Sequence, residues 1–265
     1  MRALLRTARL AAAPIAPPAF ARVQLAQAQP AQARADWSLN VERVVSPGGV
    51  EAWLVSDSTV PMIVLRAHWR GGARVEPAHQ AGLTGMVANM LTEGAGPYDA
   101  AAFKQRLETL NMGLNFSSGA DGVHMSLTTL TENRDAAFEM ARLALSQPRF
   151  DAEPLERIRR QMLVGIRQRE TNAAYLAWEA VDQALYPDHP YARRITREGV
   201  LSVTRADLAA RAAELFARDR MQVTIVGDID AATAARLLDQ TFASVPASAP
   251  IAQVEDAALN PPAPL

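Results

Sequence analysis

The order of strand-like and helix-like segments is the feature that most constrains the fold of this chain. Residues 41–69 have the pattern of three short strands separated by turns. Two helical segments follow at residues 81–91 and 98–110, and a hairpin pattern occupies residues 112–130. Four further helical patterns lie at residues 132–146, 153–169, 173–185 and 205–216. They are followed by a buried strand at residues 221–230 and a last helix at residues 231–242. Because strands and helices do not alternate strictly, the sequence predicts an α+β domain with a mainly antiparallel sheet covered by helices.

Composition excludes several classes of protein. The chain has 265 residues, of which 49% are hydrophobic and 21% charged, so it is long enough and apolar enough for a packed core. Its formal net charge of −1 argues against a nucleic-acid-binding protein, which would need a basic excess. The absence of cysteine excludes disulfides, thiolate metal sites and cysteine nucleophiles. No apolar run is long enough to span a membrane.

The first 35 residues have the composition of a targeting segment. They contain no acidic residue, begin with the cations Arg2, Arg6 and Arg9, and continue into a short apolar stretch at residues 10–20. Small residues two positions apart then form three candidate cleavage sites, the last at Ala33-Arg34-Ala35. This pattern predicts a secretory signal peptide, and therefore a periplasmic or secreted protein. A mitochondrial transit peptide is the alternative, because it is also rich in arginine and poor in acidic residues.

The chain is therefore divided into three parts. Residues 1–35 are the predicted signal or targeting segment, and residues 36–244 are the predicted α+β domain. Residues 245–265 are rich in proline and alanine, which is typical of a linker.

The helix predicted at residues 81–91 presents two stripes at helical spacing. The first is apolar and comprises Leu83, Met86, Val87, Met90 and Leu91. The second comprises Gly85, Ala88, Asn89 and Thr92, and we expect it to face solvent. A zinc-binding H-x-x-E-H motif would lie on this second stripe, with two histidines binding the metal and the glutamate polarising a water molecule. The three motif positions hold Gly85, Ala88 and Asn89, which cannot do this chemistry.

Several segments in a fixed order resemble the insulinase/pitrilysin-type zinc peptidases, which include mitochondrial processing peptidase and bacterial two-subunit relatives. The resemblance covers residues 40–244 and is carried by "PGGVEAWLVSDSTVPMIVLRAHWRGGARVEPAHQAGL", "LNMGLNFSSG", "ALSQPRFDAEPLERIRRQ", "ALYPDHPYARRITREGVLSVTRADL" and "VTIVGDID". Each segment is weak alone, but the ordered combination is specific. The resemblance implies a fold that forms one half-unit of a processing-peptidase-like chain, with residues 245–265 as a linker toward a second half missing from this sequence.

The resemblance also implies a third zinc ligand, a glutamate about eighty residues beyond the first histidine. The matching position in this chain is Gly165, within the charged helix "PLERIRRQMLVGIRQRE". All four degenerate positions, Gly85, Ala88, Asn89 and Gly165, therefore lack the residues of a zinc peptidase. We expect no metal site or cofactor in this chain, and we expect zinc in a partner subunit. Whether the chain is an enzyme in any other sense is open, but we expect no peptidase activity from it alone.

The four histidines do not supply a substitute motif. His68, His79, His124 and His189 stand in neither an H-x-x-E-H nor an H-x-x-H relation to one another. We interpret His124 as a structural residue on a strand face and His189 as a loop residue held between prolines.

The hairpin offers a different kind of site. In the resembled family a substrate peptide adds as an extra strand to the edge of the sheet, and the matching strand here contains Leu114, Asn115, Phe116 and Ser117. Binding of this kind depends on backbone hydrogen bonds, so it needs no metal. An ordinary hairpin edge without a ligand is the alternative.

Two functions remain open. The first is a non-catalytic subunit of a heteromeric zinc metallopeptidase, which contributes chamber walls and peptide binding while a homologous H-x-x-E-H subunit supplies the metal. The second is a structural or assembly protein with the same fold and no role in proteolysis. The expected partners of the first are the H-x-x-E-H subunit and a peptide substrate.

Overall fold

The protein is described by a computed structural model that covers residues 39–256. The targeting segment predicted at residues 1–35 lies outside the described residues, as do residues 257–265 of the predicted linker. Residues 246 and 247 of that linker lie against the domain, because their carbonyl oxygens accept hydrogen bonds from the amides of Arg218 and Asp219.

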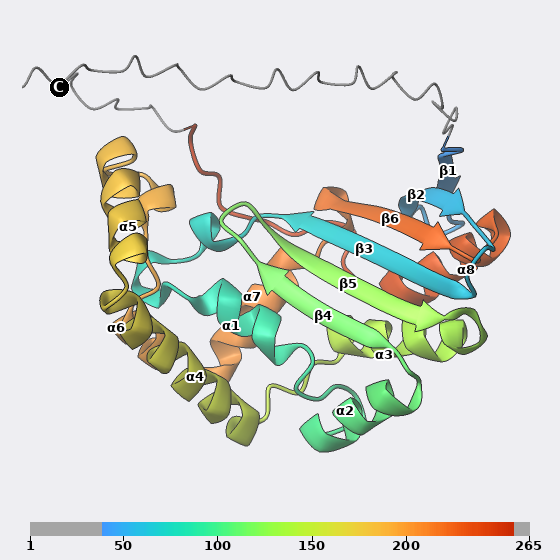
Figure 1. The fold of residues 1–265 in the computed structure, drawn as a ribbon, viewed down its shortest axis with the longest axis horizontal. Coiled ribbons are helices and arrows are strands. Elements are labelled where there is room, and N and C mark those ends of the chain that lie inside the picture. The colour runs from blue at the N-terminus through green and yellow to red at the C-terminus, as the bar shows by residue number, and fades with distance from the viewer. Residues whose placement is uncertain (1–38, 257–265) are drawn as a thin grey trace, which may run out of the picture. The chain divides into compact units, whose positions relative to one another are not determined.

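The centre of the domain is a six-stranded sheet in the order β1-β2-β6-β3-β5-β4 (Figure 1). Its strands are Glu42–Val45 (β1), Glu51–Ser56 (β2), Met62–Arg70 (β3), Gly113–Ser118 (β4), Gly122–Leu130 (β5) and Met221–Gly227 (β6). All neighbouring pairs are antiparallel except β2 and β6, which run parallel. The prediction of a mainly antiparallel α+β domain is therefore confirmed.

Some helices lie behind the sheet and others lie beside it (Figure 1). They are Leu83–Met90 (α1), Ala100–Thr109 (α2), Arg134–Ser146 (α3), Ala152–Glu170 (α4), Ala173–Leu185 (α5), Arg197–Ser202 (α6), Arg205–Leu215 (α7) and Ala231–Phe242 (α8). Figure 1 shows α3 and α8 behind the sheet, and α4, α5 and α6 on the other side of α1 from α3. The opposite face of the sheet carries no helix of the described residues. None of these helices is long and apolar enough to cross a membrane.

The core lies between the sheet and the helical layer. Alternate residues of β3 point into it, and Ile63, Leu65 and Trp69 are fully buried. The Trp69 ring meets the rings of Phe216 and Phe242 edge-on, at centroid distances of 5.0 and 6.1 Å. This alternation explains why the sequence pattern placed β3 correctly.

The helix predicted at residues 81–91 is shorter than expected. It begins at Leu83, because Gly82 takes a left-handed conformation with φ of 111° that breaks the helix before it. It ends at Met90, so Thr92 lies beyond it. The predicted apolar stripe is otherwise correct, since all five of its members are buried.

Candidate functional site

The four degenerate positions lie around one pocket of about 460 Å³. Gly85, Ala88 and Asn89 come from α1, and Gly165 comes from α4. Ser117 of β4 lines the same pocket. The structure thus brings together three elements that the sequence placed far apart.

The predicted exposure of the second stripe is only partly correct. Asn89 is exposed and Gly85 is half-buried, but Ala88 has only 3% of its surface exposed. The cause is that α1 is packed on several sides, against β4, α4 and α7. A helix enclosed in this way leaves a narrow open strip rather than a whole stripe.

The lining of the pocket does not fit a zinc ion. It comprises Gly85, Ala88, Asn89, Phe116, Ser117, Ser118, Ile158, Gln161, Met162, Gly165, Ile166, Arg169 and Ile195. Zinc sites in proteins use histidine, cysteine or carboxylate ligands, and this lining has none of them. Across residues 39–256, no three histidine, aspartate or glutamate side chains lie close enough to hold a metal ion.

The pocket has room for larger side chains at both glycines. A Cβ atom added at Gly165 would meet no heavy atom within 4 Å. A Cβ atom at Gly85 would meet Ser118 Oγ at 3.6 Å, which is an ordinary contact. Close packing therefore does not require glycine at either position. Both positions leave open space in the pocket beside β4.

The strand β4 is an edge strand of the sheet. Among the described residues it pairs with β5 on one side and with no strand on the other. The side chains of Leu114 and Phe116 are buried, and those of Asn115 and Ser117 are exposed. In the turn, Gly119 N donates to Gly122 O, so these two glycines form a hydrogen-bonded pair. The next pair in the same register is Ser118 with Val123. Because hydrogen-bonded and non-hydrogen-bonded pairs alternate, the N–H groups of Ser118, Phe116 and Leu114 point away from β5.

The turn of this hairpin is held by a side-chain cluster that the sequence analysis did not identify. Tyr191 Oη donates to Asp121 Oδ1 at 2.8 Å and accepts from Arg74 Nη1 at 3.0 Å. The hydrogen bond to Asp121 raises the pKa of Tyr191, and burial acts in the same direction. The cluster is partly exposed, so its ion pair stabilises the fold by only about 0–1 kcal/mol. Its effect is to position the end of β4.

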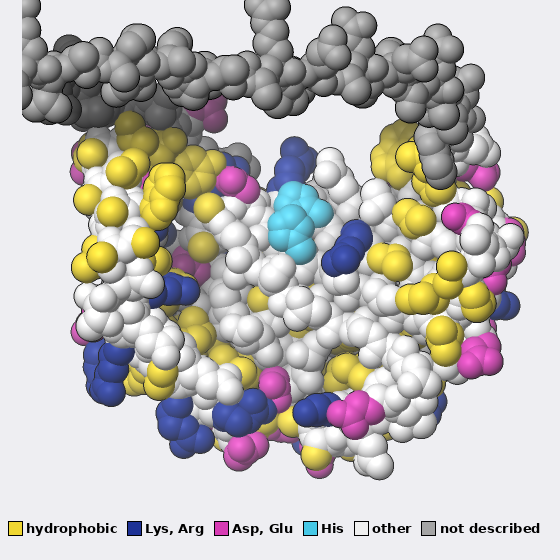
Figure 2. Space-filling view, in the orientation of Figure 1, with side chains coloured by type: hydrophobic (Ala, Val, Ile, Leu, Met, Phe, Trp, Pro, Cys, Tyr) yellow, Lys and Arg dark blue, Asp and Glu magenta, His cyan; other side chains and the backbone are white. Residues whose placement is uncertain are grey.

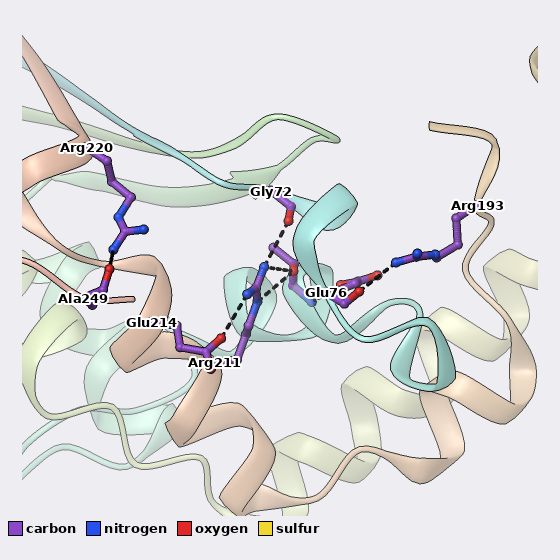
Figure 3. Close-up of polar contacts among 8 residues, drawn as sticks. Gly72, Glu76, Arg193, Arg211, Glu214, Arg220 and Ala249 are labelled. Atoms are coloured by element: carbon purple, nitrogen blue, oxygen red, sulfur yellow. Dashed lines mark hydrogen bonds and ion pairs between the residues drawn. The ribbon is translucent and has the colours of Figure 1, made fainter. Parts of the chain in front are cut away.

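The start of α1 is held by the buried carboxylate of Glu76. Gly82 N donates to Glu76 Oε1 at 2.7 Å and Thr84 N donates to Oε2 at 2.8 Å. These amides have no partner within the helix, and the positive end of the helix dipole also favours a carboxylate there. Arg193 Nη1 donates to the backbone oxygen of Glu76 at 2.7 Å (Figure 3). Glu76, which precedes α1 in the chain, therefore fixes the position at which the helix begins.

A buried arginine from α7 binds the same region. Arg211 Nη2 donates to Gly72 O at 3.0 Å and to Thr84 Oγ1 at 3.2 Å, and Nη1 donates to Glu214 at 3.1 Å (Figure 3). Burial lowers the pKa of Arg211, and the carboxylate of Glu214 acts in the opposite direction. The three acceptors supply the hydrogen bonds that a buried guanidinium needs.

The sequence of this chain is similar to known peptidase-related proteins. The family model for insulinase (peptidase family M16) matches residues 58–199, and the model for the peptidase M16 inactive domain matches residues 202–264. The chain is 29% identical over 172 residues to "Non-peptidase homolog YmxG" of Helicobacter pylori. The aligned residues make up 64% of this chain and 40% of that protein.

Solved structures show the same fold. The peptidase M16 inactive domain from Pseudomonas fluorescens aligns with a TM-score of 0.77 and 27% identity, over 83% of this chain and 54% of that one. The periplasmic protease PqqL from Escherichia coli aligns with a TM-score of 0.72 and 15% identity, over 83% of this chain and 26% of that one, a likeness of fold alone. This chain thus spans about half or less of the length of these relatives.

Replacing Glu76 with glutamine should destabilise the domain by about 1–3 kcal/mol, because two buried helix amides lose a charged acceptor. The measurement is the free energy of unfolding in urea. Glu51→Gln is the matched control, since it removes a carboxylate from an exposed pair with Arg43 and should cost about 0–1 kcal/mol. Equal losses in the two variants would show that Glu76 does not hold α1.

The purified chain should contain no stoichiometric zinc, as measured by elemental analysis. The variant Gly85→His, Ala88→Glu, Asn89→His, Gly165→Glu should bind zinc, because the four positions line one pocket and the glycines leave space. The matched control retains Asn89 and should bind zinc more weakly, since it lacks one ligand. Tightly held zinc in the unmodified chain would contradict this prediction.

Proposed function

The chain belongs to the insulinase family of peptidases (family M16), and from this premise we propose that it is a non-catalytic subunit of a heteromeric zinc metallopeptidase. In this proposal a homologous H-x-x-E-H subunit supplies the metal. The present chain contributes part of the wall of the reaction chamber and a strand to which peptide substrates bind. It requires no cofactor of its own.

The observation that carries this proposal is the composition of the pocket between α1, α4 and β4. The pocket contains the four positions that the resemblance assigns to the family's catalytic residues, and its lining has no histidine, cysteine or carboxylate for zinc. The helices α1 and α4 and the edge strand β4 nevertheless form the walls of this pocket. A chain that keeps the walls of a site and lacks its reactive groups is suited to binding rather than to catalysis.

Peptide binding is supported by the geometry of β4. Its outward-pointing N–H groups at Ser118, Phe116 and Leu114 can pair with an extended peptide, which adds as a further strand. The cluster of Tyr191, Asp121 and Arg74 fixes the end of the strand before any ligand arrives. A strand held in this way loses little conformational freedom on binding.

A partner subunit is supported by an exposed apolar surface on α5. Trp178 has 69% of its surface exposed, and Leu176 and Val181 on the same helix are also exposed. Figure 2 shows hydrophobic side chains gathered over this part of the molecule. Exposed apolar groups of this kind are typical of surfaces that another protein covers. A stable interface would bury more than about 1,000 Å² in total.

The composition of residues 1–35 supports export of the chain, so we infer a periplasmic or secreted complex whose partner is exported to the same compartment. A mitochondrial location is the alternative for the same segment.

The direct test mixes the full-length protein with the H-x-x-E-H homologue from the same organism. Peptide turnover should rise when this subunit is added, because the chamber and the peptide-binding strand are then complete. The measurement is the rate of cleavage of an unstructured peptide by the partner, with and without this chain. A partner that is equally active alone would favour the structural or assembly role in place of this one.

The variant Ser118→Pro should weaken peptide binding by the complex by about two- to tenfold, because proline removes one outward N–H donor. Ser118 is suitable because its side chain is exposed, whereas the side chain of Phe116 belongs to the core. Ser118→Ala is the matched control, since it removes the hydroxyl and keeps the N–H. Equal affinities for these two variants would show that peptides do not pair with β4.

A further inference from the structure

The open face of the sheet contains a second pocket, of about 310 Å³, whose lining is cationic or neutral. It comprises Arg66, Ala67, His68, Asn115, Ser117, His124, Met125, Ser126, Gln222 and Thr224. These residues come from β3, β4, β5 and β6, and none of them is acidic. Figure 2 shows histidine side chains on this face, with cationic side chains near them.

Two histidines from neighbouring strands line this pocket. His68 of β3 is directly opposite His124 of β5, and their rings stack with a centroid distance of 4.5 Å and an interplanar angle of 26°. His124 forms a hydrogen-bonded pair with Ser117 of β4, so its backbone N–H and C=O groups point away from β3. His124 and His68 therefore form a non-hydrogen-bonded pair, the kind of pair in which cross-strand side chains are closest. Two imidazolium ions so close together repel each other unless an anion lies beside them.

The charged groups around the histidines are mainly cationic. Burial lowers the pKa of His68, and the nearby His124 and Arg70 add to this effect, whereas Asp121 acts against it. The carboxylate of Asp121 is already bound by Tyr191 and Arg74. Among the pocket-lining residues, β4 and β6 present only neutral hydroxyl and amide groups to the pocket. This environment disfavours a metal cation and favours an anion.

We propose that this pocket binds a carboxylate of an acidic peptide that lies on the open face of the sheet beside β4. Arg66 supplies a permanent charge, protonated His68 and His124 supply further charge, and the hydroxyl and amide groups donate hydrogen bonds. The proposal rests on the proposed function, because it names acidic peptides as the ligands that the same strand binds.

The affinity for such a peptide should depend on pH. The lowered pKa of His68 favours its neutral form when the pocket is free, and a bound carboxylate favours its protonated form. Binding therefore takes up protons and strengthens as the pH falls from about 7.5 to about 5.5, a range in which a peptide glutamate stays ionised.

The experiment compares a glutamate-containing peptide with the same peptide carrying glutamine, using fluorescence anisotropy with the full-length protein. The glutamate peptide should bind about tenfold more tightly at the lower pH, and the glutamine peptide should show no such change. His124→Gln and Arg66→Gln should each weaken binding of the glutamate peptide about tenfold and leave binding of the glutamine peptide unchanged. His79→Gln is the matched control, because His79 is exposed and lies outside the pocket.

The histidine resonances provide a second measurement that a structural role would not affect. In an NMR titration, the lowered pKa of His68 should rise when the glutamate peptide is added and should not change with the glutamine peptide. Equal affinity for the two peptides, with the sensitivity to Ser118→Pro retained, would overturn this inference and leave the proposed function standing. Free glutarate binding as tightly as the peptide, or stoichiometric Zn²⁺ binding that His124→Gln removes, would also overturn it.

Discussion

The carboxylate of Glu76 is the interaction on which the geometry of the candidate site depends. It accepts hydrogen bonds from the amides of Gly82 and Thr84, at the point where the left-handed Gly82 ends the preceding turn. Arg211 binds Thr84 from α7, so the first turn of α1 is tied to the loop before it and to a helix far along the chain. A helix of only eight residues would be marginal in isolation, and these contacts together with its buried apolar stripe determine where it lies.

This arrangement explains how the fold tolerates motif positions that lack ligands. The helix α1 is held by Glu76, Arg211 and its apolar stripe, and none of these groups belongs to the degenerate motif. In proteins whose metal contributes to folding, loss of the ligands unfolds the chain. Here the contacts that position α1 are separate from the four positions that the resemblance assigns to the catalytic residues. Glycine and alanine can therefore occupy those positions without loss of the surrounding architecture.

The local elements could be predicted from the sequence, whereas their assembly could not. Strand β3 and helix α3 have clear periodicity, and the helix predicted at residues 98–110 corresponds to α2, whose first turn is capped by the side chain of Asp99. The insertion of β6 between β2 and β3 depends on pairing across more than 150 residues, for which a single sequence gives no signal. A similar reason explains why the roles of Arg211 and Tyr191 were missed, because their partners Thr84 and Asp121 are distant in the sequence. The partners of Glu76 are close in the sequence, but its role depends on the conformation of the loop before α1. The stacking of His68 on His124 follows from the register of two distant strands.

The two pockets are related through β4. Ser117 lines both the pocket at the degenerate motif positions and the pocket that contains the two histidines. An extended peptide paired with β4 would direct successive side chains to opposite faces of the sheet. One side chain would then point toward the partly apolar space beside Gly85 and Gly165, and the next toward the open face with its cationic groups. A peptide with alternating apolar and acidic side chains therefore satisfies both surfaces in one register, and a shift of one residue would reverse both matches.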